Sequence, residues 1–135
     1  MVEKPLPEID ADSAPFWRGT RERRLLLPHC LACGRPHFPP RVLCPHCHAD
    51  GIEWKPASGE GTVYTYTVAR RAASAAFEDD VPYVVALIDL AEGVRMMSNV
   101  VTDDPAKVTI GAPVRVTFER ASDEITLPKF ELVAA

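Results

Sequence analysis

The residues best suited to chemistry lie in one short segment, CLACGRPHFPPRVLCPHC, which contains all four cysteines of the chain. Two of the four histidines lie inside this segment and the other two flank it directly. The cysteines form two Cys-x-x-Cys pairs, Cys30 with Cys33 and Cys44 with Cys47, and ten residues separate the pairs. Thiolates and imidazoles are the ligands that transition metals such as zinc prefer, so the segment predicts a metal site.

The spacing of each pair predicts a tight turn that points two thiolates at one ion, with backbone N–H groups behind the sulfurs. Gly34 follows the first pair, where we expect a positive φ. Two such turns facing each other form a tetrahedral site with ligands Cys30, Cys33, Cys44 and Cys47, which suits Zn²⁺. Four cysteine ligands leave no coordination position for water or substrate, so we expect this zinc to be structural.

Three other interpretations of the segment carry less weight. Two disulfides would suit an oxidising compartment, but paired Cys-x-x-Cys spacing in a reducing one is typical of a metal site. A histidine could replace one cysteine, although His46 lies inside the second pair and cannot easily turn inward; we expect all four histidines on the surface. Iron of the rubredoxin type would make the chain a small electron carrier, but no second redox centre is evident.

Length and composition describe an ordinary globular protein. The 135 residues suit one domain, or one small domain with a smaller module, and 47% hydrophobic with 25% charged residues is unremarkable. No run approaches the roughly 18 apolar residues of a membrane helix. The polar, acidic stretch MVEKPLPEIDADS does not resemble a secretory signal. We therefore expect a cytoplasmic protein that does not enter a membrane.

The net charge of −4 is unevenly distributed. Residues 1–50 carry seven basic and six acidic groups, a sum of +1, whereas residues 51–135 carry eight basic and thirteen acidic groups, a sum of −5. The larger part of the chain thus lacks the positive field that a nonspecific nucleic-acid binder needs.

Before the cysteines, we expect a flexible lead over residues 1–12 and then a short helix. Ser13 is a suitable N-cap and Pro15 is tolerated in a first turn. Phe16 and Trp17 would anchor this helix, while Gly19 weakens it by about 1 kcal/mol relative to alanine. The apolar run 25–27 predicts a strand, and residues 49–61 are interpreted as a connector.

After the connector, five segments have the composition of strands. They cover residues 62–69, 82–90, 94–101, 113–120 and 127–133, with a hairpin at Ala-Glu-Gly between the second and third. We expect Tyr64 and Tyr66 on one face of the first strand, the second strand to be covered on both faces, and the last to lie at an edge. Five such strands favour a small closed or nearly closed β-barrel, such as an OB-fold.

The chain is thus predicted to be mainly β, with an N-terminal lead and helix over 1–24, a Cys₄ zinc ribbon over 25–54 and a five-stranded OB-fold barrel over 55–135. The chain contains few of the residues and motifs that enzymes commonly use for catalysis. Every cysteine is assigned to metal, every histidine lies in or beside the ribbon, and GxSxG, HExxH and phosphate-binding glycine loops are absent. A carboxylate-only enzyme is the remaining catalytic interpretation.

Several motifs occur in an order that resembles a known family: FW, CLACGRPHFPPRVLCPHC, EWKPASGEGTVYTYTVARR, PYVVALIDLAEGVRMMSNVV, IGAPVRVTFER and LPKF. They resemble the acyl-CoA-associated OB-fold proteins with an N-terminal rubredoxin-like zinc ribbon, formerly a domain of unknown function. The resemblance covers roughly residues 14–131. The ribbon alone is unspecific, but the ribbon followed by SGEGTVYTYT, LAEG and IGAPVRV is specific.

The resemblance implies a noncatalytic accessory subunit that partners a thiolase-fold enzyme (a thiolase, aldolase or synthase) or a hydratase with a hot-dog fold. Such subunits help to form or bridge an acyl-CoA site, and a two-by-two heteromer is expected. The zinc ligands of the family carry over onto the four cysteines, but no CoA-binding motif does. Within the long segment 70–81, Arg70, Arg71 and Phe77 are our candidates for CoA contacts, because that loop is long, partly basic and aromatic. The alternative function is a single-stranded nucleic-acid binder, a common use of OB-folds.

Overall fold

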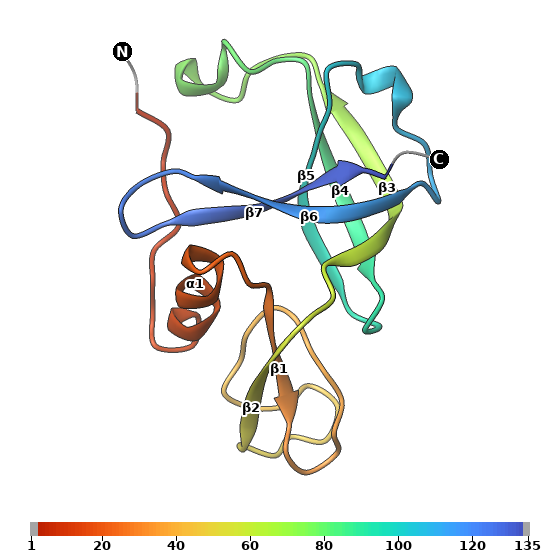
Figure 1. Ribbon diagram of the computed structural model, residues 1–135. Helices are drawn as coiled ribbons and strands as arrows, with labels where there is room; N and C mark the ends of the chain where they lie inside the picture. The colour runs from red at the N-terminus through yellow and green to blue at the C-terminus, as the bar shows by residue number, and fades with distance from the viewer. Residues whose placement is uncertain (1–2, 134–135) are drawn as a thin grey trace.

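A computed structural model describes residues 3–133 and divides them into a small metal-ribbon lobe and a larger β-barrel (Figure 1). A short helix packs beside both lobes. The elements in chain order are α1 (Ala14–Arg21), β1 (Leu26–Cys30), β2 (Ile52–Pro56), β3 (Glu60–Ala69), η1 (Ala75–Phe77), β4 (Tyr83–Leu90), β5 (Arg95–Val101), η2 (Pro105–Lys107), β6 (Pro113–Arg120) and β7 (Thr126–Leu132).

The barrel is closed by five strands in the order β3-β4-β5-β7-β6, and β6 returns to β3. All neighbouring pairs are antiparallel except β5 with β7, which is parallel. This arrangement confirms the predicted five-stranded barrel. The prediction that the last strand lies at an edge is wrong, because β7 pairs with β6 on one side and with β5 at Val100 and Val101 on the other. Closure gives each of the five barrel strands a partner on both sides.

The core lies inside the barrel and continues to the helix. Along β4, every second residue is buried, ending at Ile88 (0% exposed) and Leu90 (3%), and Phe130 of β7 is fully buried against them. The intervening residues of β4, among them Val85 and Leu87, are only half-buried. The expectation that this strand is covered on both faces is therefore wrong, because its outer face lies on the outside of the barrel.

A β-bulge changes which side chains of β3 share a face. The pairing register between β3 and β4 shifts between Val63 and Thr65, so Tyr64 is the extra residue. Val63 is buried at 1% exposure and Tyr66 packs against the core, whereas Tyr64 is 48% exposed. The prediction that Tyr64 and Tyr66 share a face is wrong, because one inserted residue reverses the alternation.

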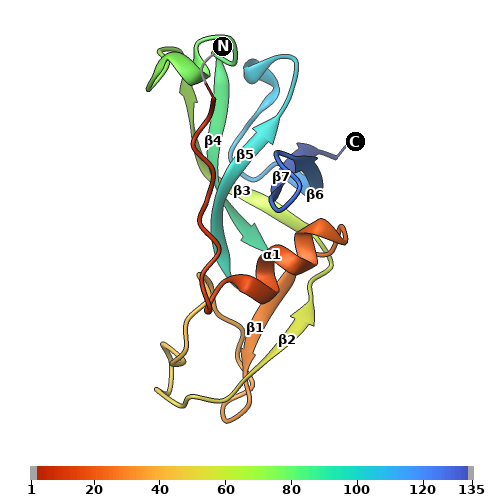
Figure 2. The same ribbon diagram turned by 90° about the vertical axis from the view of Figure 1, so that its left-hand side faces the viewer.

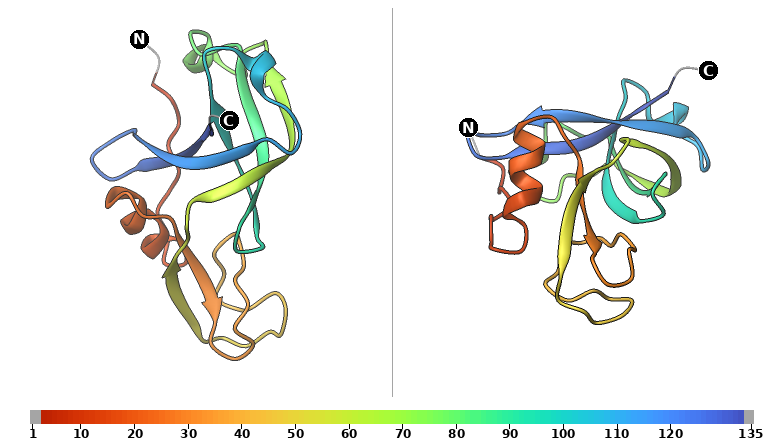
Figure 3. Two further views of the ribbon diagram at one scale, coloured as in Figure 1. Left: turned by 45° about the vertical axis from the view of Figure 1, so that its right-hand side comes forward. Right: turned by 60° about the horizontal axis from the view of Figure 1, so that its bottom comes forward.

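The segment expected to be a connector contains a strand. Residues 52–56 form β2, which pairs antiparallel with β1 in a two-stranded sheet from Leu26↔Pro56 to Cys30↔Ile52. Figure 3 shows this sheet between the ribbon loops and the barrel. Alternation over five residues, IEWKP, was too short and too close to the turn residues to stand out in the sequence.

Helix α1 begins after a turn that Asp10 and Ser13 stabilise. Ser13 N donates to Asp10 Oδ1 over 2.8 Å, and Asp10 N donates to Ser13 Oγ over 3.2 Å. The Ser13 side chain therefore does not cap the helix as predicted, although proline lies in the first turn. Gly19 brings α1 close to β1, because a Cβ there would lie 2.7 Å from Leu26 Cγ. Within residues 3–133, no helix is long and apolar enough to cross a membrane.

Candidate metal centre and the loop between β3 and β4

The four cysteine sulfurs converge on one point in the ribbon. They all lie within 4.8 Å of one another, with Cys30 Sγ 3.5 Å from Cys47 Sγ and Cys33 Sγ 3.8 Å from Cys44 Sγ. A disulfide would require about 2.05 Å, so these are free thiols. Four sulfurs around zinc at the usual bond length lie about 3.8 Å apart, so the chain presents a donor set of the right type and spacing for one Zn²⁺.

Each pair of cysteines is held by the same backbone turn. Cys33 N donates to Cys30 Sγ and His46 N donates to Cys44 Sγ, both over 3.4 Å, as the spacing predicts. Gly34 has φ 76°, which confirms the positive φ expected there. The amides behind the sulfurs stabilise the thiolate form that a metal requires.

The thiols differ in acidity because their hydrogen bonds differ. The Cys33 backbone N–H lowers the pKa of Cys30 to about 6. At Cys47, the Ala49 backbone N–H favours the thiolate, but the sulfur of Cys30, the partial desolvation of the Cys47 sulfur and the other two sulfurs outweigh it and raise the pKa of Cys47 to about 11. One thiol of the cluster is thus prepared for metal binding at neutral pH, whereas another keeps its proton until a cation displaces it.

Burial divides the ligands into an inner and an outer pair. Cys30 and Cys44 are buried at 2% and 0% exposure, while Cys33 and Cys47 are exposed. One buried and one exposed sulfur from each pair enclose the ion position from four directions. A metal with four thiolate ligands has a complete tetrahedral shell, so its contribution is to shape and not to turnover.

The histidines lie around this centre but do not join it. His46 and His48 are exposed as expected, and His46 Nε2 lies 3.4 Å from the Pro36 carbonyl oxygen. The expectation that all four lie on the surface is wrong for His37, which is 3% exposed. Its backbone N–H donates to Pro28 O over 3.0 Å, so pairing of the ribbon loop with β1 carries the ring inward.

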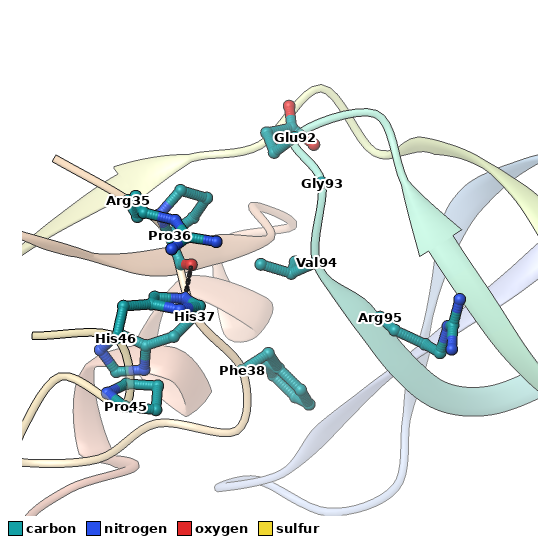
Figure 4. Close-up of a pocket in the computed structure, with 10 residues that line it drawn as sticks. All are labelled: Arg35, Pro36, His37, Phe38, Pro45, His46, Glu92, Gly93, Val94 and Arg95. Carbon is teal, nitrogen blue, oxygen red and sulfur yellow. Dashed lines mark hydrogen bonds between the residues drawn. The ribbon is translucent and has the colours of Figure 1, made fainter.

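A cleft of about 420 Å³ separates the ribbon from the β4–β5 hairpin (Figure 4). Arg35, His37 and His46 lie on the ribbon side, and Glu92 and Arg95 lie on the hairpin side. The two lobes also meet beside the cleft, at the connector after β2.

The contact between the two lobes at this connector is made by the turn between β4 and β5. Glu92 Oε2 accepts a hydrogen bond of 2.9 Å from Ser58 N, and Glu60 O accepts one of 2.9 Å from Ala91 N. These bonds fix the point at which the chain passes from the ribbon into the barrel.

The candidate CoA-contacting residues are separated within the loop between β3 and β4. Arg70 and Arg71 follow the end of β3 and are exposed, and within residues 3–133 neither forms an ion pair. Phe77 lies at the end of η1 and is half-buried, with its ring centroid 6.2 Å from that of Tyr83. The two arginines are therefore free to meet an anion, whereas the phenylalanine packs against the base of its own loop.

Little in the sequence indicates that this loop contacts the N-terminal lead. Lys4 Nζ lies 2.6 Å from Asp80 Oδ2 and 5.7 Å from the centroid of the Phe77 ring. Lys4 is a cation in an otherwise acidic stretch of residues 1–12, and that isolated charge is the one signal that could have identified it.

A four-cysteine ribbon followed by a closed five-stranded barrel defines the class of OB-fold proteins that carry a zinc ribbon on their N-terminal side. Two family models match the chain in the same order. The model of the ChsH2 rubredoxin-like zinc ribbon domain matches residues 17–53, and that of the ChsH2 C-terminal OB-fold domain matches residues 54–119. The chain belongs to this family, which includes the DUF35 domain-containing scaffold proteins.

Relatives of similar length are named as scaffold proteins. The DUF35 domain-containing scaffold protein of Methanothermobacter thermautotrophicus is 37% identical over 80% of this chain and 82% of its own length. A probable enoyl-CoA hydratase alpha subunit of Thermomonospora curvata is 41% identical over 94% of this chain, but the chain spans only 39% of that protein. Among solved structures, a chain of the Ltp2-ChsH2(DUF35) aldolase superposes with a TM-score of 0.86 at 40% identity, over 96% of this chain and 100% of its own.

Proposed function

We propose that the chain is a noncatalytic scaffold subunit that partners a thiolase-fold enzyme and helps to form its acyl-CoA site. The observation that carries the proposal is the match, over the whole of the other chain, to a component of an aldolase named Ltp2-ChsH2(DUF35). The chemistry of the ribbon supports it, because a four-thiolate shell offers no position for substrate. The barrel strands contain neither cysteine nor histidine, so the usual nucleophile–base pairs are absent there.

The names of the relatives also mention hydratases, but those names belong to longer proteins. The chain spans 39% and 35% of the two hydratase alpha subunits, so most of each hydratase subunit has no counterpart here. The relatives that match along most of their length are called scaffold proteins. A thiolase-fold partner in a two-by-two heteromer is therefore our proposal, and a hot-dog-fold hydratase is the alternative partner.

The proposed division of labour follows the predicted boundaries. Helix α1, within the predicted N-terminal segment 1–24, and the ribbon, residues 25–54, would present a fixed surface to the partner, and the barrel, residues 55–135, would carry the loop that reaches the acyl-CoA. A cytoplasmic location belongs to the same proposal, because a reducing compartment keeps the four thiols available for zinc.

Within the barrel, we assign the CoA contacts to Arg70, Arg71 and Phe77. The two arginines are exposed and free of ion pairs in the described chain, so they can donate to phosphate oxygens without losing another partner. The Phe77 ring is half-buried and would have to turn out of its present contacts to meet the adenine or the acyl chain.

Co-expression tests the subunit role. The chain is produced with a tagged thiolase-fold enzyme encoded beside it, and we expect the two to co-purify and the isolated chain to convert no acyl-CoA. Turnover by the chain alone would refute the scaffold role. Co-purification with a hot-dog-fold hydratase instead would replace the partner, and tight binding of single-stranded oligonucleotides would favour the nucleic-acid alternative.

Kinetics of the assembled complex test the CoA contacts. Replacing Arg70 and Arg71 together by alanine should raise KM for acyl-CoA by on the order of tenfold or more, with kcat little changed, because charge-assisted hydrogen bonds to the substrate are lost. The matched control replaces Arg115 and Arg120, two exposed arginines on strand β6 of the barrel, and should leave KM unchanged. Equal effects of the two double variants would reject the assignment.

A further inference from the structure

The N-terminal lead crosses the outside of the barrel and ends at the loop between β3 and β4. Figure 2 shows it rising beside β4 from the start of α1 to that loop. Residues 3–12 contain no helix or strand, and all of them are exposed. Even its larger apolar side chains, Leu6 and Ile9, remain 43% and 39% exposed. The lead is thus held against the barrel by little hydrophobic burial.

The backbone of the lead is also not paired with any barrel strand that the structure describes. Within the described residues, no backbone hydrogen bond joins residues 3–9 to the barrel. By contrast, the turn that follows is fixed by the reciprocal bonds between Asp10 and Ser13. The lead therefore has a fixed base at α1 and, beyond it, an arm of about seven residues that is not joined to the barrel by its backbone.

Near its base, the arm lies beside the turn between β6 and β7, where Leu6 and Ile9 line a shallow hollow with Ile125. At its far end, the arm is attached by the side chain of Lys4. Lys4 Nζ lies 2.6 Å from Asp80 Oδ2 and 5.7 Å from the centre of the Phe77 ring, so a single ammonium makes both an ion pair and a cation–π contact. The neighbouring Glu78 and Asp79 leave the loop acidic, which complements the cation. The Lys4 ammonium is charged at neutral pH, as lysines ordinarily are, and the hydrogen bond with Asp80 raises its pKa further.

The loop has local contacts of its own that report whether it is closed. Phe77 N donates to Ser74 O and Asp80 N donates to Phe77 O, both over 3.0 Å. The Phe77 ring also packs against Tyr83, where β4 begins. These amides are protected only while the turn is folded, so their exchange with solvent measures the opening of the loop.

We propose that residues 3–12 form a detachable latch, in which Lys4 closes the loop between β3 and β4 by covering Phe77 and pairing with Asp80. The latch restrains the half-buried Phe77 ring in the isolated chain, and a competing group that displaces Lys4 releases it. Because both contacts lie at the surface, the latch depends on ionic strength. Its consequence for acyl-CoA contact rests on the function proposed above, but the latch itself is a property of the isolated chain.

Amide hydrogen exchange of the full chain, read by mass spectrometry, tests the latch. In Lys4→Met, exchange in residues 75–83 should accelerate about five- to tenfold, as expected from the loss of one exposed ion pair and one cation–π contact. The matched control is Lys107→Met, which removes another exposed pair, with Asp103, on a different loop. This control should leave residues 75–83 unchanged. Raising the salt concentration should accelerate exchange in the parent chain and not in Lys4→Met.

A variant in which the two charges of the ion pair are swapped distinguishes loss of the latch from a general loss of stability. The double variant Lys4→Glu with Asp80→Lys reverses the ion pair and should recover part of the lost protection, whereas Lys4→Glu alone should be the most open. Exchange of residues 75–83 in Lys4→Met within twofold of the parent would overturn the proposal. Acceleration that extends equally through β4 and β5 would also overturn it, because the effect would then not be local. Neither outcome depends on whether an enzyme partner binds the chain.

Discussion

His48 occupies, in the second cysteine turn, the position that Gly34 occupies in the first. Gly34 N donates to Cys30 O and His48 N donates to Cys44 O, both over 2.8 Å. Their φ angles are 76° and 67°, so both residues lie in the left-handed region. The two halves of the metal site therefore use the same backbone turn, once with glycine and once with a residue that carries a Cβ.

This equivalence predicts opposite effects of two substitutions. His48→Gly should raise the free energy of unfolding of the zinc-loaded chain by about 0.5 kcal/mol, because relief of the left-handed strain exceeds the added entropy of the unfolded chain. Gly34→Ala should lower it by about 1 kcal/mol, since a Cβ is disfavoured at this φ. Nothing lies within 4 Å of a Cβ at position 34, so the loss would report backbone conformation alone. Denaturant unfolding measures both; changes of the same sign would contradict the equivalence.

Zinc uptake should release protons at neutral pH. A thiol whose pKa is about 11 is protonated at pH 7, whereas one whose pKa is about 6 is mostly thiolate, so Cys47 must lose its proton on metal binding and Cys30 largely need not. Calorimetry in buffers of different ionisation enthalpy counts the protons, and Cys47→Ser should reduce the count by about one. The sign also predicts that zinc affinity falls as pH is lowered from 9 towards 6. Uptake without proton release would contradict this.

Removal of the metal should unfold the ribbon and spare the barrel. Between Cys30 and β2, the buried apolar residues are Cys30 and Cys44, and Leu31, Val42 and Leu43 are more than half exposed. Zinc contributes about 10–16 kcal/mol to folding in small zinc modules, so this segment has little else to hold it. Treatment with a chelator should accelerate amide exchange in residues 31–51 and leave β4 and β7 protected. Cooperative loss of both lobes would show that the barrel also depends on the metal.

Two glycines with positive φ should differ in their tolerance of alanine. At Gly59, φ is 83° and a Cβ would lie 2.5 Å from Val116 Cγ1, whereas at Gly93, φ is 93° and a Cβ would meet nothing within 4 Å. Gly93→Ala should therefore cost about 1 kcal/mol through the backbone alone. Gly59→Ala should cost about 2–4 kcal/mol, because β6 must also move away. Equal decreases in the free energy of unfolding, measured by thermal or denaturant unfolding, would show that β6 moves away from the new Cβ without strain.

The part of the fold that was predicted correctly is encoded over short stretches of chain. Cys-x-x-Cys spacing fixes how two thiolates can face one ion, and the same local geometry made the positive φ of Gly34 predictable. Short runs rich in β-branched, aromatic and other apolar residues identified all five barrel strands, and Ala-Glu-Gly located the hairpin at Gly93. Each of these features depends on residues within one turn or one strand.

One error is local, since the Ser13 hydroxyl bonds to Asp10 in place of the helix. The other errors concern residues whose environment is set from far along the chain. The exposure of Tyr64 depends on where β4 pairs with β3, and the position of β7 depends on a parallel contact with β5. His37 is buried because its segment pairs back onto β1. The periodicity of apolar residues within one segment cannot predict such contacts, since they join stretches that are distant in sequence.

By itself, the sequence determined the ligands of the zinc ribbon and the run of strands, because a metal selects donor atoms and a pleated strand selects side chains over a few residues. The tertiary structure decided how the barrel closes, which tyrosine faces solvent and which loop Lys4 reaches. These outcomes depend on the packing of segments that are distant in sequence. The stabilising free energy arises from the contact between two such segments, so neither segment determines it alone.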